Sequence, residues 1–178
     1  MNHWKKIESI LKFKNQYIKV WEDKVELPSK KHITYTRVDL PDFVSIIPVF
    51  KDEIVLVRNY RYAIDQFCLE LPSGHLMARE KPEDAARREL KEETGFFGKK
   101  FTFLMKYFAA ADRTNLTSYI FLAKDLELGS PLRDETEEMS IVYLKKEEIL
   151  SKILKNEIVH PPTIIGLMLY LFLEEKQC

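Results

Sequence analysis

The chain of 178 residues lacks several features by which common classes of protein are recognised. Its 2 cysteines, Cys68 and Cys178, are too few and too far apart in sequence for a disulfide framework, which favours a reducing environment. Its 4 histidines show no metal-ligand spacing. Lys and Arg together number 28, as do Asp and Glu, so the chain has no general electrostatic attraction to nucleic acid or anionic membranes.

Long apolar runs are also missing. Residues 1–16 lack the apolar stretch of a signal peptide. Residues 164–173 are apolar apart from Gly166 and Tyr170, but they cover only about half a membrane span. We therefore expect a cytoplasmic protein that has neither a membrane nor a nucleic acid as its partner. Its length suits one domain, with or without a small appendage.

The pattern of apolar, β-branched and aromatic residues predicts a mixed fold. Strands are expected at 17–21, 33–38, 43–50, 54–57, 101–108, 118–123 and 141–144, and helices at 146–154 and 162–175. Strands on both sides of a further helix, with a helical tail, predict an α/β fold of the α+β type in which helices pack against a sheet. We expect residues 1–40 to form a small N-terminal β-rich module and residues 41–178 to form the main domain.

The further helix lies within the segment from Gly74 to Phe96. The middle of this segment consists of Ala, Leu, Arg, Lys and Glu, which are strong helix formers. Pro82 suits the first turn of a helix, and Gly95 suits its end. The sequence therefore predicts a helix of about three turns, bounded by these two residues.

Three carboxylates share one stripe of this predicted helix. Glu89, Glu92 and Glu93 are spaced i, i+3 and i+4, and like charges so placed repel one another unless a cation offsets them. Carboxylate oxygens with no Cys or His nearby favour a hard ion, Mg²⁺ or Mn²⁺, over Zn²⁺. A solvated acidic face is the alternative interpretation.

The spacing of the whole segment resembles the Nudix box, the signature of the Nudix hydrolase family. The matching positions are Gly74, Glu80, Arg88-Glu89-Leu90, Glu92-Glu93 and Gly95, and the one departure is Phe96, where a bulky aliphatic residue is more usual. Upstream, Arg58-Asn59-Tyr60-Arg61 and Glu70-Leu71-Pro72-Ser73-Gly74 are similar to the ADP-ribose pyrophosphatase branch. The resemblance implies the Nudix fold, with a mixed β-sheet sandwiched between helices. It also implies cleavage of a pyrophosphate bond with Mg²⁺ or Mn²⁺, using more than one ion per site.

The box residues have expected roles in metal binding and catalysis. We expect Glu89 and Glu93 to be direct metal ligands, and Glu92 to be a further ligand or a bridge to a second metal. The resemblance adds the backbone carbonyl of Ser73 to the metal site. Arg88 cannot bind a cation, so we expect it to pair with box carboxylates and fix their side chains; a surface ion pair is the alternative. Arg88 and Glu92 belong, with Glu135, to the predicted catalytic set.

A dense acidic stretch, residues 134–138, lies downstream of the box. The related branch brings a Glu-x-Glu pair over the metals from a loop. On that resemblance Glu135 is the general base that takes a proton from the attacking water, and Glu137 is an added metal ligand. Glu138 is the rival for either role, and a solvated loop is the alternative. Glu80 is expected to brace the box loop or a water next to the metal.

Arg61 is the expected contact for the substrate, because a guanidinium group matches phosphate or carboxylate oxygens with paired donors. Arg58 and Arg79 are further candidates, and solvated surface residues are their alternative. Enzymes of the ADP-ribose branch commonly carry a Ser-Pro-Gly segment after the box, whereas residues 107–115 contain no proline. The pocket wall would therefore differ, and Asp112 would contact the non-nucleotide half of another nucleoside diphosphate compound.

These features predict a hydrolase that acts on a nucleoside diphosphate linked to a further moiety. ADP-ribose, cleaved to AMP and ribose 5-phosphate, is the first expectation, and a nucleotide sugar or a dinucleoside polyphosphate is the alternative within the class. From another class, the alternative is a Nudix module that senses a nucleotide without cleaving it. The complete set of box carboxylates argues against that module. The resemblance also implies a homodimer formed through the N-terminal module.

Overall fold

The structure is a computed structural model that describes residues 3–129 and 139–176. The chain divides into two compact units. The N-terminal unit takes in Met1–Asp42 and Tyr107–Thr117, and the main unit takes in Phe43–Lys106 and Ser118–Cys178. Each unit is built around its own sheet.

The N-terminal unit is a three-stranded antiparallel sheet in the order β1-β2-β3. Its strands are β1 (Lys5–Lys14), β2 (Lys19–Glu26) and β3 (His32–Asp39). A turn joins β2 to β3, where the N–H of Leu27 donates to the carbonyl of Lys31 at 2.8 Å. The sequence did not predict β1. Two irregularities in its pairing with β2 break the regular alternation of apolar and polar residues that a strand prediction needs.

A polar network lies on one face of this sheet. Asp23 is only 4% exposed and accepts hydrogen bonds from Ser9 and from Nε of Arg37, the latter at 2.7 Å. Arg37 also pairs with Asp39, whose other oxygen accepts from the indole N–H of Trp21 at 2.7 Å. Burial raises the pKa of Asp23, but the hydrogen bonds outweigh it and hold the pKa below its ordinary value. Hydrogen bonds among polar side chains, and not apolar packing alone, therefore hold this face of the three-stranded sheet together.

The segment after the box that lacks a proline belongs to the N-terminal unit. The N–H of Val38 donates to the carbonyl of Arg113 at 2.8 Å, and that of Leu40 donates to Oδ1 of Asn115 at 3.0 Å. The hydroxyl of Tyr35 donates to the backbone carbonyl of Asp112. Hydrogen bonds to the end of β3 thus fix this segment without a Pro-Gly turn.

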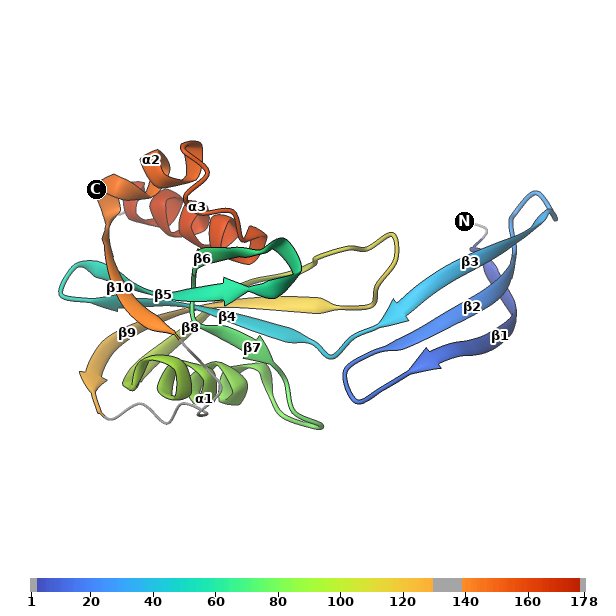
Figure 1. The fold of residues 1–178 in the computed structure, drawn as a ribbon, viewed down its shortest axis with the longest axis horizontal. Coiled ribbons are helices and arrows are strands. Elements are labelled where there is room, and N and C mark those ends of the chain that lie inside the picture. The colour runs from blue at the N-terminus through green and yellow to red at the C-terminus, as the bar shows by residue number, and fades with distance from the viewer. Residues whose placement is uncertain (1–2, 130–138, 177–178) are drawn as a thin grey trace. The chain divides into compact units, whose positions relative to one another are not determined.

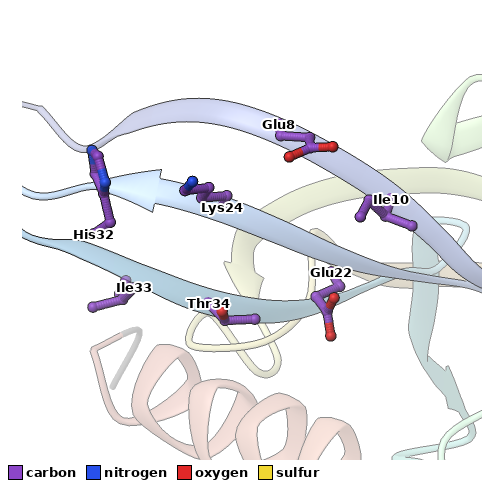
Figure 2. A pocket seen from close by; sticks show the side chains of 7 residues that line it. All are labelled: Glu8, Ile10, Glu22, Lys24, His32, Ile33 and Thr34. Carbon is purple, nitrogen blue, oxygen red and sulfur yellow. The ribbon is translucent and has the colours of Figure 1, made fainter.

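A hollow of about 250 Å³ lies on the three-stranded sheet. Figure 2 shows the side chains that line it, which come from all three strands: Glu8, Ile10, Glu22, Lys24, His32, Ile33 and Thr34. Glu8 lies opposite Lys24 in the β1–β2 register, and Glu22 pairs with Lys12 at 2.8 Å. Because opposite charges alternate here, the hollow is a solvated, charge-balanced surface.

The main unit contains a seven-stranded mixed sheet, whose main path is β10-β5-β4-β9-β8. β6 pairs with β5, β7 pairs with β4, and the β4–β9 pair is parallel. The strands are β4 (Phe43–Phe50), β5 (Glu53–Arg61), β6 (Gln66–Glu70), β7 (Ser73–His75), β8 (Phe96–Phe108), β9 (Thr117–Leu128) and β10 (Ser140–Lys145). The helices are α1 (Pro82–Thr94), α2 (Ile149–Leu154) and α3 (Pro161–Glu175), with short 3₁₀ turns η1 (Tyr62–Ile64) and η2 (Lys146–Glu148).

Strand β4 lies at the centre of the main unit, between α1 on one face of the sheet and α3 on the other (Figure 1). Val44 and Ile46 pack in one cluster with Leu90 of α1. Ile47, on the opposite face, lies against Gly166 of α3, where a side chain would collide with the neighbouring Leu71. Burial on both faces explains the continuous apolar run of β4. The predicted mixed sheet between helices is confirmed.

The box helix α1 has the predicted ends. Pro82 occupies its first turn, and Gly95 ends it in the left-handed conformation, with φ of 75° and its N–H donating to the carbonyl of Lys91 at 2.9 Å. The predicted helix at 146–154 is 3₁₀ in its first turn and α-helical from Ile149. In the described part of the chain, no helix has the length and apolar character needed to span a membrane.

Candidate active site

Helix α1 holds the three predicted metal ligands at different depths. Glu93 is 8% exposed and Glu89 is 12% exposed at its side chain, whereas the side chain of Glu92 is 37% exposed. Leu90 and Ala86, between and beside them, are fully buried and fix the helix against β4. The packing of α1 therefore buries the carboxylate of Glu93 and leaves that of Glu92 partly exposed to solvent.

Arg88 is the donor that joins the box carboxylates. Its Nε and Nη2 donate to the two oxygens of Glu80, both at 2.9 Å. Its Nη1 donates to Oε1 of Glu89 at 2.7 Å and to Oε2 of Glu92 at 2.9 Å. Nη2 also reaches the backbone carbonyl of His75 at 3.0 Å. These contacts raise the pKa of Arg88, chiefly through Glu80, and place its guanidinium where the sequence analysis expects it.

Glu80 links this centre to the box loop. Its Oε2 accepts a hydrogen bond from the N–H of Met77 at 2.8 Å, and its own N–H donates to the carbonyl of Met77 at 3.0 Å. The hydrogen bonds from Arg88 lower the pKa of Glu80, and the Met77 N–H adds to the effect. Glu80 therefore braces the loop, one of the two roles expected for it.

The Ser73–Gly74 segment lies directly against α1. The N–H of Ser73 donates to Oε2 of Glu93 at 2.9 Å, and both residues are buried. Gly74 packs so closely on the carboxylate of Glu89 that no side chain fits between them. The predicted backbone ligand and two predicted carboxylate ligands are thus brought together by β7 and α1.

We expect Gly74→Ala to impair the site without unfolding the chain. The added methyl group would overlap the carboxylate of Glu89, which sits at the end of a flexible side chain and can rotate away. Because misplacing a reacting group by about 1 Å can cost about 100-fold in rate, kcat/KM should fall by about that factor. The melting temperature should change little. Steady-state kinetics and thermal unfolding measure both quantities, and an unchanged kcat/KM would show that the position of Glu89 does not matter.

The donor set fits a hard divalent cation. Glu89, Glu92, Glu93 and the backbone of Ser73 offer oxygen atoms, the ligands that Mg²⁺ and Mn²⁺ prefer. Among the described residues, no group of three or more His, Cys, Asp or Glu side chains is already arranged around a common point for a metal. Arg88 holds oxygens of Glu89 and Glu92, so a cation would have to share or displace that contact.

The predicted substrate contacts lie in different surroundings. Arg61 makes a two-pronged pair with Glu70, with Nε to Oε1 at 2.8 Å, although its side chain remains 42% exposed. Arg58 stacks on the ring of Phe67, with 3.8 Å from its guanidinium carbon to the ring centre. Arg79 is exposed in the loop before α1, with φ of 67°.

The remaining predicted site residues are Asp112, Glu135 and Glu137. Asp112 is an exposed residue of the N-terminal unit, with Oδ2 3.9 Å from Nε of Arg113. Glu135, Glu137 and the rival Glu138 lie outside the described residues.

A buried polar cluster at Glu70 and Leu71, just before Ser73, was not predicted from the sequence. Glu70 is 1% exposed, and Nδ1 of His160, the residue before α3, lies 3.9 Å from its Oε2 and 3.0 Å from Oγ1 of Thr163 in the first turn of α3. A charged residue that ends the apolar strand β6 could have marked Glu70 as a buried, paired carboxylate. Nothing in the local sequence points to His160 and Thr163, which lie about ninety residues downstream.

Comparisons with known proteins point to one family. The family model for the NUDIX domain matches residues 40–164. The chain is 29% identical over 166 residues to the ADP-ribose pyrophosphatase of Bacillus subtilis (strain 168), covering 92% of this chain and 89% of that protein. It is 30% identical over 167 residues to the methanol dehydrogenase activator of Bacillus methanolicus, with the same coverage of 92% and 89%.

A further relative is the ADP compounds hydrolase NudE of Escherichia coli (strain K12), which is 35% identical over 94 residues, 53% of this chain and 50% of that protein. The crystal structure of an ADP compounds hydrolase superposes with a TM-score of 0.91 at 23% identity, over 99% of this chain and 97% of that one. An identity this low shows a shared fold. Because the family model spans most of the sequence and includes every box residue, the chain belongs to the Nudix family.

Proposed function

We propose that this chain is a metal-dependent Nudix hydrolase that cleaves the diphosphate of a nucleoside diphosphate derivative, and that ADP-ribose is its substrate. The observation that carries the proposal is that Glu89 and Glu92 are joined by Arg88, while Glu93 of the same helix is held against the backbone of Ser73. Relatives named for ADP-ribose and ADP compounds support the choice of substrate. In the reaction, a water oxygen bonds to one phosphorus and the anhydride P–O bond breaks, which gives AMP and ribose 5-phosphate.

Different residues of the site have different proposed roles. Glu89, Glu93 and the carbonyl of Ser73 would hold Mg²⁺ or Mn²⁺, with Glu92 as a further ligand, and a second ion fits so acidic a centre. The bound cation supplies neutralisation of the diphosphate oxygens and a lower pKa for a ligated water. Arg88 keeps the side chains of Glu89 and Glu92 in place. Arg61, Arg58 and Arg79 would bind substrate oxygens.

The substrate test is a panel of nucleoside diphosphate compounds incubated with Mg²⁺. ADP-ribose, ADP-glucose, UDP-glucose and diadenosine polyphosphates carry no phosphomonoester, so each hydrolysis creates a group that phosphatase converts to free phosphate. We expect ADP-ribose to give the highest kcat/KM. A higher kcat/KM on another compound would favour the alternative substrates, a nucleotide sugar or a dinucleoside polyphosphate. The segment without proline that contains Asp112 suggests such a substrate. Binding of a nucleotide without any release would indicate a sensing module.

We propose Glu135 as the general base and Glu137 as an added metal ligand. Glu135→Gln should lower kcat by about 100- to 10,000-fold, because general base catalysis contributes that much, with little change in KM. Steady-state kinetics on the preferred substrate measures both. If Glu138→Gln has this effect and Glu135→Gln does not, the base is Glu138.

We further propose that the protein is cytoplasmic and forms a homodimer through residues 1–40. Large apolar side chains are exposed on this part of the chain, which is unusual on a surface that faces only water. They include Trp4, Ile7, Ile10, Leu11 and Phe13, each between 44% and 56% exposed. Sedimentation velocity of the full chain measures the mass of the assembly, and a monomer at all concentrations would contradict the proposal.

A further inference from the structure

Thr163 holds the strand end that leads into the box. It lies in the first turn of α3 and is 0% exposed. Its Oγ1 accepts a hydrogen bond from the backbone N–H of Leu71 at 2.9 Å. Leu71 is also fully buried, so this N–H has no access to solvent as a replacement acceptor.

His160, the residue that precedes α3, makes a hydrogen bond with the side chain of Thr163. Its Nδ1 lies 3.0 Å from Oγ1 of Thr163, and the two atoms share one hydrogen bond. The same Nδ1 is 3.9 Å from Oε2 of Glu70, the carboxylate that also accepts hydrogen bonds from Arg61. Burial lowers the pKa of His160, which keeps the ring neutral in this position.

The three consecutive residues that follow β6, the last of which begins β7, are each held by a different element of the main unit. Leu71 donates to Thr163 of α3. The carbonyl of Pro72 accepts from the N–H of Ile46 of β4 at 2.9 Å, and the N–H of Ser73 donates to Glu93 of α1 at 2.9 Å. The position of the Ser73 backbone is therefore set partly by α3, which itself carries none of the box residues.

We propose that Thr163, supported by His160, is a positioning residue for the metal site. By fixing Leu71 it fixes the backbone of Ser73, and with it the carbonyl that Ser73 offers to the cation. The inference rests on the proposed function, because it assumes that a divalent cation binds at Ser73, Glu89 and Glu93. Partners that orient metal ligands typically contribute about 10- to 100-fold to metal affinity or activity.

The test compares Thr163→Val with Thr163→Ser in the full chain. Valine keeps the shape but removes the acceptor of the Leu71 N–H, whereas serine keeps the hydroxyl. We expect Thr163→Val to bind Mn²⁺, titrated by electron paramagnetic resonance, at least about tenfold more weakly than wild type. Hydrogen–deuterium exchange of a peptide that spans residues 70–76 should become faster. Thr163→Ser should stay within about twofold of wild type in affinity.

A role in stability alone would lower the melting temperature of Thr163→Val but leave its Mn²⁺ affinity unchanged at temperatures well below melting. That result overturns the inference, as does an equal loss of affinity in Thr163→Ser. If Thr163→Val does not fold, His160→Ala replaces it, since it leaves the Thr163 hydroxyl in place but removes its support. His160→Ala should weaken Mn²⁺ binding in the same direction, and unchanged affinity overturns the inference.

Mn²⁺ binding, hydrogen–deuterium exchange and turnover together distinguish a failure of the Thr163 proposal from a failure of the proposed function. A wild-type chain that binds no Mn²⁺ contradicts the metal assignment itself. The exchange rates of residues 70–76 then decide whether Thr163 orders the segment, and equal rates in wild type and Thr163→Val overturn the positioning role. A wild type that binds Mn²⁺ but cleaves no compound contradicts the substrate proposal and leaves the affinity comparison valid.

Discussion

Glu93→Gln should lower kcat on the preferred substrate by at least about a thousandfold, because it removes a charged group that we propose as a ligand of a cation, and such a cation stabilises the transition state by several kcal/mol. The fold should survive. Glutamine keeps the length of the side chain and a carbonyl oxygen that can still accept the hydrogen bond from the N–H of Ser73. Steady-state kinetics at saturating Mg²⁺ and thermal unfolding measure the two effects.

The matched control for Glu93→Gln is Glu83→Gln. Glu83 lies in the first turn of the same helix and makes an exposed pair with Arg87, so its loss removes one negative charge without touching the site. Its kcat should stay close to that of wild type. Near-normal activity of Glu93→Gln in the presence of Mg²⁺ would show that Glu93 is not a metal ligand, and an equal loss in both variants would point to a general charge effect.

Arg88→Gln should lower the free energy of unfolding by about 1–3 kcal/mol when divalent cations are absent. That is the range expected when buried charged groups lose their hydrogen-bond partner. Glu80 and Glu89 have side chains only 13% and 12% exposed, and both accept hydrogen bonds from Arg88. With Mg²⁺ present the difference should shrink, since a bound cation offsets the same carboxylates. Chemical denaturation with Mg²⁺ and with a chelator measures this, and a difference that grows with Mg²⁺ would contradict it.

The same variant has an expected pH dependence. The hydrogen bonds from Arg88 lower the pKa of Glu80 from its ordinary 4.5, so their contribution to stability is fully present above pH 4.5. It is lost as the pH falls through the lowered pKa and Glu80 becomes protonated. The stability gap between wild type and Arg88→Gln should therefore narrow in acid. Arg87→Gln, which breaks an exposed pair one residue away, should show a much smaller effect on stability at every pH.

The sequence was informative where local pattern and packing agree. The apolar run of β4 reflects burial on both faces, and the bounds of α1 follow from a proline and a glycine whose conformations suit helix ends. It was uninformative for β1, where almost every side chain is exposed and the pairing is irregular. Periodicity reports burial, so a strand that buries little leaves no pattern to recognise.

In the candidate site too, some features could be predicted from the sequence and others could not. The box positions of α1 were predictable because their spacing is local, and the contact between Arg88 and Glu92 is one turn of helix. The support that Thr163 gives to Leu71 depends on the packing of α3 against the sheet, which local sequence does not encode. Arg61 was predicted as a substrate contact from its chemistry, and its pairing with Glu70 appeared only once β5 and β6 were placed side by side.

Arg88 also bears on how the proposed metal site would behave when metal is scarce. The chain carries an internal counter-ion for its own acidic cluster, so the cluster does not need dissolved ions to keep the fold, unlike domains that collapse when stripped by a chelator. Loading the centre is then an exchange of one positive charge for another. If the enzyme depends on a divalent cation as proposed, such an exchange would allow it to stay folded and inactive until the cation binds.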